Sequence, residues 1–194
     1  MKNAINRFLV SSLALLILSA FISAARVGRD DNRVPDVPDT IGVPIGHKVH
    51  FHGFARGVQI YTWNGASWGS AVPEATLFDD DGNVVVTHFA VFDEDGKVVG
   101  PAWESNSGSR VVGALPPVGI IVDEDSIPWL RLTAVEELTH GPGILANTTF
   151  IHRLNTVGGK APKVNGTVIG QVARVPYTAD YFFYRKTNKT EDPV

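Results

Sequence analysis

The sequence predicts an all-β protein, an antiparallel barrel or sandwich with at most one or two short helices. From His47 onward, short apolar runs recur about every ten to twelve residues, a spacing typical of these two architectures. Gly, Pro, Asn and Asp separate the runs. Two Asp-Gly pairs, Asp81-Gly82 and Asp95-Gly96, each lie between apolar runs. Because these residues tolerate the positive φ angles of tight turns, each pair predicts a hairpin.

The expected strands follow from these turns in chain order. Asp81-Gly82 connects the first two strands, Asp95-Gly96 begins the third, and the polar run from Asn106 to Ser109 leads into the fourth. The second strand is apolar at odd and even positions alike, which predicts that both of its faces are covered. The expected strands are Glu74–Phe78, Val84–Phe92, Lys97–Val99, Arg110–Leu115, Ile127–Ala134, Thr148–Leu154 and Ala179–Tyr184.

One segment allows two interpretations. Thr133 and Glu136 have the spacing of a helix capping box, and Gly141 has the position of a helix end, so a short helix from Ala134 to His140 is one possibility. A strand followed by a loop fits the same residues equally well.

The amino terminus predicts export. Lys2 and Arg7 precede an uncharged apolar run from Phe8 to Ala24, and small residues close the run at Ala24 and Ala25. This is the layout of a secretory signal peptide over residues 1–25. A retained membrane anchor is the alternative, but the run barely reaches the minimum length for a spanning helix. We therefore expect a secreted protein with no membrane association after cleavage.

The remaining chain divides into three parts. Residues 26–46 contain Pro35, Pro38 and Pro44 and predict an extended N-terminal arm rather than a core element. Residues 47–186 form one β domain, and residues 187–194 form a tail. Three N-glycosylation sequons begin at Asn147, Asn165 and Asn188.

Composition excludes several classes of function. The chain has no cysteine, so thiol chemistry and disulfides are excluded. Its formal charge is −3, and removal of Lys2 and Arg7 makes the mature chain −5, so nucleic acid is an unexpected partner. No phosphate-binding loop and no dinucleotide-binding glycine motif is present, which excludes a nucleotide-dependent dehydrogenase. We expect no cofactor.

Histidines are the first candidates for a site. His50 and His52 are two residues apart, so on a strand they share a face and could bind a metal ion with a third ligand. A polar outer face on an edge strand explains the same pair without a metal. His88 and His152 lie among apolar residues, and each is either a hydrogen-bonded core residue or part of a pocket lining.

Large aromatic residues and a carboxylate complete the candidate set. Glu104 follows Trp103, and an acid beside a large aromatic ring has a raised pKa when it is poorly solvated. Trp129 is a further residue able to stack on a sugar ring, although tryptophans more often form a core. The predicted ligand-binding residues are His88, Trp103, Glu104 and Trp129.

A set of short motifs resembles a known family. The motifs are Gly57-Val58-Gln59-Ile60-Tyr61, Trp68, Pro73-Glu74-Ala75, His88-Phe89-Ala90, Trp103-Glu104, Gly108-Ser109, Ile127-Pro128-Trp129-Leu130, Thr156-Val157-Gly158-Gly159, Ala161-Pro162 and Val175-Pro176-Tyr177-Thr178-Ala179-Asp180-Tyr181. Their order over residues 53–184 resembles the exported domain-of-unknown-function 3455 family. The resemblance implies no catalytic residues. Some fungal relatives are labelled malate dehydrogenase, which the missing nucleotide motif does not support.

The resemblance also marks a departure. Many relatives in that family carry cysteines at the positions of Trp63 and Asn165, so the resemblance implies a disulfide that this chain has lost as a unit. A bridge closing a loop of about 100 residues contributes up to ~4.7 kcal/mol in the chain-entropy model. We expect Trp63 to pack in the vacated space.

Three functions fit these observations. The first is binding of a small apolar or carbohydrate ligand in a barrel or sandwich pocket. The second is an extracellular hydrolase or isomerase that uses His88 and Glu104 as acid and base. The third is a structural extracellular or cell-wall protein without a ligand.

Overall fold

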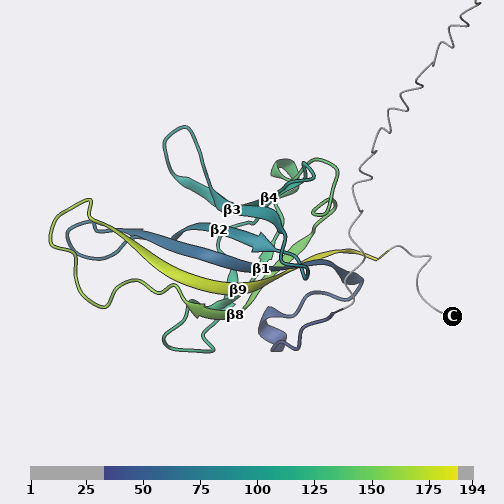
Figure 1. The fold of residues 1–194 in the computed structure, drawn as a ribbon, viewed down its shortest axis with the longest axis horizontal. Coiled ribbons are helices and arrows are strands. Elements are labelled where there is room, and N and C mark those ends of the chain that lie inside the picture. The colour runs from purple at the N-terminus through teal and green to yellow at the C-terminus, as the bar shows by residue number, and fades with distance from the viewer. Residues whose placement is uncertain (1–32, 188–194) are drawn as a thin grey trace, which may run out of the picture.

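A computed structural model describes residues 33–187 as a single antiparallel sheet of nine strands (Figure 1). The expected all-β fold is thereby confirmed. The signal peptide, the first part of the arm, Asn188 and the rest of the tail lie outside the described residues. The strands are β1 (His47–Thr62), β2 (Val72–Phe78), β3 (Val84–Phe92), β4 (Val98–Ser105), β5 (Arg110–Val112), β6 (Val118–Ile120), β7 (Trp129–Thr133), β8 (Phe150–Gly158) and β9 (Val172–Lys186).

The sheet curls because its two flanks meet at one end. The strand order is β5-β4-β3-β2-β1-β9-β8-β7-β6, and the long strands β1 and β9 lie side by side in the middle. At the flanks, the Val135 amide donates to the Val112 carbonyl and the Ala114 amide to the Thr133 carbonyl, each at 2.8 Å. These bonds join the ends of β5 and β7. The result is a half-barrel with an inner and an outer face.

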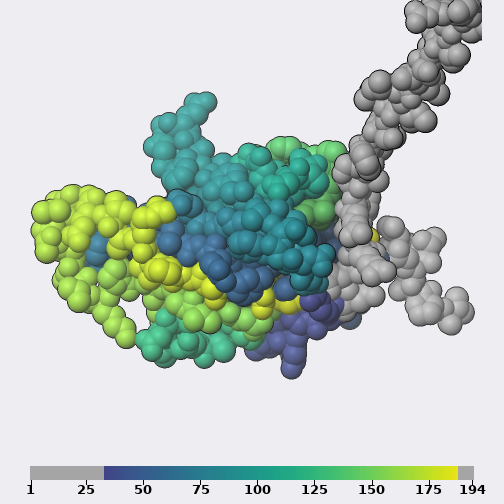
Figure 2. Space-filling view, in the orientation of Figure 1, coloured from purple at the N-terminus to yellow at the C-terminus, as the bar shows by residue number. Residues whose placement is uncertain are grey.

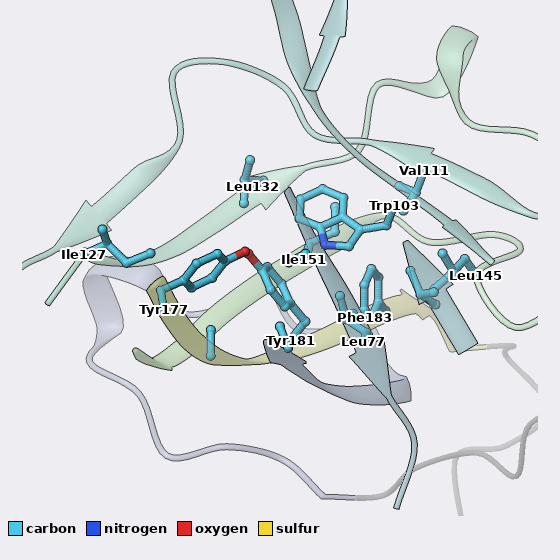
Figure 3. Close-up of a cluster of buried hydrophobic side chains, with 14 residues drawn as sticks. Leu77, Trp103, Val111, Ile127, Leu132, Leu145, Ile151, Tyr177, Tyr181 and Phe183 are labelled. Carbon is cyan, nitrogen blue, oxygen red and sulfur yellow. The ribbon is translucent and has the colours of Figure 1, made fainter. Parts of the chain in front are cut away.

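Alternate residues of the strands fill the inner face. Every strand except β6 contributes to this cluster, and Trp103 of β4 and Tyr181 of β9 are its largest members (Figure 3). Burial of such side chains stabilises the fold by roughly 1.5–3 kcal/mol each. The inner cluster comprises Ala55, Ala75, Leu77, Val86, Trp103, Val111, Ile127, Leu132, Leu145, Ile151, Tyr177, Ala179, Tyr181 and Phe183.

The N-terminal arm covers part of the outer face. Its short 3-10 helix η1 (Asp39–Ile41) inserts Ile41, which is fully buried, against Val49, Leu154 and Phe182. Figure 2 shows this purple segment packed on the lower edge of the molecule. The expectation that the arm is not a core element is therefore wrong for Ile41. A side chain of this size, once buried, holds the arm on the sheet.

Two further expectations are corrected. The strand Val84–Phe92 has one face with a buried centre, whereas on its other face Val85, Phe89 and Val91 are only half-buried and Thr87 is exposed. The second face is therefore partly covered rather than fully covered. Between Ala134 and His140 the chain forms the 3-10 helix η2 (Glu136–Leu138), and no side chain caps it.

The hairpins are as predicted. Gly82 and Gly96 have φ angles of 79° and 76°, which only glycine adopts at little cost. Asp79 and Asp93 accept backbone hydrogen bonds across these turns. Between residues 33 and 187, no helix is long and apolar enough to cross a membrane.

Candidate functional site

A cavity of about 990 Å³ lies at the end of the sheet where the two flanks meet. It receives residues from the start of β1, the end of β7, η2, the 139–149 loop, the start of β8 and the end of β9. Its lining is His47, Thr133, Ala134, Glu136, Thr139, His140, Gly141, Ala146, Asn147, Thr148, Thr149, Phe150, Arg185 and Lys186. Its volume is at the upper end of the range for small-molecule sites.

The lining of the cavity is about half polar and half apolar, and it carries more cationic than anionic groups. Arg185 and Lys186 supply two permanent positive charges, and Glu136 is the single carboxylate of the lining. The His47 ring meets the Phe150 ring edge-on, with centroids 4.9 Å apart. His47 Nδ1 donates to the Pro44 carbonyl at 3.0 Å, which fixes the ring orientation. The site therefore combines hydroxyls, cations and one aromatic ring.

Hydrogen bonds hold the wall of the cavity in place. The Leu145 amide donates to Ser109 Oγ at 2.9 Å, and the Ile144 amide donates to Ser107 Oγ at 3.0 Å. Both hydroxyls lie 2.8 Å from Ser105 Oγ. On the other side, the Thr149 hydroxyl donates to the Tyr184 carbonyl at 3.1 Å. A wall fixed at both ends makes the cavity preformed, which lowers the entropic cost of binding.

Glycines let the wall approach the β4–β5 hairpin. A Cβ at Gly141 would lie 2.2 Å from the Gly108 carbonyl oxygen, and one at Gly143 would lie 2.1 Å from Ser107 Oγ. Both glycines also have positive φ angles. Larger residues at either position would push the loop away and open the cavity.

The sequence-predicted residues His88 and Trp103 lie together on the inner face. Their rings stack with centroids 4.4 Å apart at an interplanar angle of 7°. His88 Nδ1 donates to the Ala102 carbonyl at 2.8 Å. Complete burial lowers the pKa of His88 to about 3, although this hydrogen bond favours the charged form. His88 is therefore neutral at physiological pH.

Glu104 and Trp129 lie elsewhere. In the β3–β4 register, His88 pairs with Trp103 and Thr87 pairs with Glu104, so Glu104 is on the opposite face. Its carboxylate is half exposed and lies 4.0 Å from Arg110. Trp129 packs in the outer cluster beneath the arm. The four residues do not form one site, and the geometry argues against His88 and Glu104 as a catalytic pair.

His50 and His52 have separate partners. His50 Nε2 donates to Thr148 Oγ1 at 3.0 Å, and His52 Nε2 donates to Asp180 Oδ1 at 3.1 Å. A bulge between Val49 and Phe51 breaks the alternation that would have placed both rings side by side. Within residues 33–187, no three His, Cys, Asp or Glu side chains are grouped to hold a metal ion.

Burial alone would raise the pKa of the Asp180 carboxylate that His52 contacts. Hydrogen bonds from His52 and Asn155 outweigh this effect and hold the Asp180 pKa below its ordinary value. The carboxylate therefore stays ionised, and it fixes the orientation of the His52 ring. This contact gives His52 a structural role.

His152 is a hydrogen-bonded core residue. Its Nε2 donates to the Ile41 carbonyl at 2.7 Å, and its Nδ1 accepts from the Tyr184 hydroxyl at 3.0 Å. Burial lowers its pKa. This neutral ring links the N-terminal arm to the sheet.

Comparison with known proteins gives the family. Residues 44–185, more than half of the chain, match the family described as protein of unknown function (DUF3455). The chain belongs to the DUF3455 family. No curated protein and no solved structure matches the chain. The match supports the resemblance and gives no support to a malate dehydrogenase label.

Sequence reasoning missed most of the cavity of the DUF3455 domain. Phe150, Arg185 and Lys186 carry no local motif, and they meet His47 only through the pairing of β1, β8 and β9. The one signal in the sequence was the sequon at Asn147, because Asn147 lines the cavity.

Proposed function

We propose that the DUF3455 domain is a secreted binding protein that takes an acidic carbohydrate in the cavity between η2, the 139–149 loop and the ends of β1 and β9. The 990 Å³ cavity, with its mixed polar and apolar lining and its cationic groups, carries this proposal. Of the two ligand classes that the sequence suggests, an apolar molecule offers no hydrogen-bonding group to the polar half of this lining. A sugar offers hydroxyls to the polar groups and a ring face to the apolar ones.

The charges indicate which carbohydrate is favoured. Lys186 is exposed at the rim of the cavity, so a carboxylated sugar gains an electrostatic attraction that a neutral sugar lacks. Phe150 is half-buried and offers apolar surface for a ring face. We include export in the proposal. The arguments for export are the leader-like residues 1–25 and the sequons. A uronic-acid oligosaccharide is the corresponding probe.

Charge reversal at the rim tests the proposal. We expect Lys186→Glu to weaken binding of trigalacturonate by roughly five-fold or more, because an exposed charge pair contributes up to about 1 kcal/mol and reversal doubles the effect. Lys97→Glu makes the same change in charge on the exposed β3–β4 hairpin and is the matched control. Calorimetric titration measures both variants, with neutral galactotriose as the second ligand. Equal affinity of the two variants, or no binding of either sugar, contradicts the proposal.

The sequon at Asn147 gives a second test. Asn147 is exposed, lines the cavity and has a φ angle of 61°. A glycan attached there occupies the space that the ligand needs, so chain glycosylated at Asn147 is expected to bind trigalacturonate more weakly. Asn147→Gly removes the sequon, keeps the backbone angle and adds no charge. It restores binding in the same expression host. Unchanged binding by the glycosylated chain places the ligand elsewhere.

A further inference from the structure

A second group of polar side chains surrounds Tyr181 inside the half-barrel. Tyr181 is 1% exposed, and its ring meets His88 at 5.2 Å and Trp103 at 5.4 Å between centroids. Its hydroxyl lies 3.4 Å from the Tyr177 hydroxyl. Arg153 is the register partner of Tyr181 on β8, and its guanidinium interacts with the Tyr181 hydroxyl. Figure 3 shows both hydroxyls and the indole nitrogen in one part of the interior.

This interior has donors without acceptors. Trp103 Nε1 and Gln59 Nε2 are buried and have no hydrogen-bond partner. Trp103 Nε1 belongs to a ring that meets Tyr181, whereas Gln59 lies six residues along β1 from Gly53, the register partner of Tyr181. An unpartnered buried donor costs roughly as much as a lost hydrogen bond, so it indicates a partner that binds there.

Arg153 brings a positive charge to the border of this interior. Arg153 is half-buried and donates from Nε and Nη2 to the Pro128 carbonyl, at 3.2 and 2.9 Å. None of the ion pairs formed by residues 33–187 includes Arg153.

The neighbours of Arg153 bring no negative charge. Burial keeps His88 neutral, and burial also raises the pKa values of Tyr177 and Tyr181, so both phenols stay protonated at neutral pH. A guanidinium beside neutral donors is complementary to a single negative charge.

We infer that the half-barrel interior binds a small monocarboxylate around the Tyr181 hydroxyl. Its carboxylate accepts hydrogen bonds from Arg153 and from Trp103 Nε1, and its short apolar part contacts the inner cluster. The ligand is small because the fourteen side chains of the inner cluster fill most of the interior. This site is separate from the cavity of the proposed function, because none of these residues lines that cavity.

The indole N–H of Trp103 provides a direct readout. The protein is labelled with ¹⁵N-tryptophan, and Trp103→Phe identifies the Trp103 resonance among the four indole signals. Propionate is then compared with propionamide, which has the same shape and no charge. We expect propionate to move the Trp103 indole proton downfield in a saturable manner, while propionamide leaves it in place.

Variants test the role of Arg153. Arg153→Gln is expected to weaken propionate binding by roughly ten-fold or more, because a charge-assisted hydrogen bond is lost. Arg174→Gln, an exposed arginine paired with Glu74, is the matched control and keeps wild-type affinity.

If Arg153→Gln does not fold, the comparison of propionate with propionamide on the wild-type protein still tests whether the interior binds a carboxylate. Equal responses to the two probes, no response of the Trp103 signal, or a nuclear Overhauser contact to a long-lived water with no effect of propionate each overturn the inference. Trigalacturonate binding is not involved in this experiment, so its failure leaves the proposed function standing.

Discussion

The inner cluster around Trp103 and the outer cluster beneath the arm differ in whether their buried polar groups have hydrogen-bond partners. Each buries a histidine in neutral form. In the outer cluster, both nitrogens of His152 are hydrogen-bonded, one to the Ile41 carbonyl and one to the Tyr184 hydroxyl. In the inner cluster, Trp103 Nε1 has no partner and Arg153 forms no ion pair within the described residues.

The inferred monocarboxylate site rests on this difference. A closed hydrogen-bond set such as that of His152 fixes the arm on the sheet and leaves nothing for a ligand. Open donors cost stability unless something binds them. Among residues 33–187, His52 Nδ1 and Arg110 Nε are also buried without a partner, so what distinguishes the inner face is the indole donor beside an arginine that forms no ion pair within that range.

The largest expected effect is in the inner cluster. Trp103 is 1% exposed, whereas Trp129 in the outer cluster is half-buried. We expect Trp103→Ala to lower the free energy of unfolding by about 3–5 kcal/mol, and Trp129→Ala to have a clearly smaller effect. Urea unfolding of both variants measures the difference. Equal losses would mean that the inner face does not dominate the core.

The next effect concerns the arm. Ile41 is fully buried, and we expect Ile41→Ala to cost about 2–5 kcal/mol, because it creates a cavity beside His152. Exposed Ile45 gives the matched control, since Ile45→Ala changes the same atoms in solvent. The same urea experiment applies. A decrease in the free energy of unfolding of less than about 0.5 kcal/mol for Ile41→Ala would mean that the arm is not part of the core.

The smallest expected change in the free energy of unfolding is the change per pH unit in acid. Folding lowers the pKa values of His88 and His152 below the unfolded value near 6.5, so the unfolded chain binds protons first as pH falls. Stability is complete above about pH 6.5 and decreases below it, by up to about 1.4 kcal/mol per pH unit for His88, and His152 adds to the decrease in the same direction. The contribution of His88 continues to about pH 3.

A variant series checks this response. His88→Phe is expected to flatten the pH dependence of the free energy of unfolding between pH 6.5 and 4. His140→Gln, at an exposed histidine, is expected to leave the slope unchanged. An unchanged slope in His88→Phe contradicts burial of a neutral His88.

The sequence predicted the two Asp-Gly hairpins and the strands β2 and β3 well, because these depend on local turn chemistry. The sequence alone also implies that Trp103 and Glu104 lie on opposite faces of the sheet, since neighbouring residues on a strand point to opposite faces. The cavity was beyond sequence reasoning, because Phe150 and Lys186 reach it from separate strands. The long strand β1 was missed because its bulge and its alternating polar residues hide the apolar pattern.

At Trp63, the family resemblance correctly indicated two positions that are close in space. The family pattern implied that positions 63 and 165 are close in space, and Trp63 indeed packs against Gly166, where a Cβ would lie 2.4 Å from Trp63 Cγ. Trp63 is 5% exposed and its ring contacts Trp68. The indole thus packs where the resemblance places the lost disulfide.

The central claim is that the cavity at the joined flanks is the ligand site. A ¹⁵N-amide spectrum of the protein titrated with trigalacturonate tests it most directly. We expect saturable shifts confined to the lining, chiefly at His47, Thr149, Phe150 and Lys186, with the β3–β4 hairpin unaffected. Shifts that appear only outside this lining, or a spectrum that does not change at saturating sugar, would contradict the account.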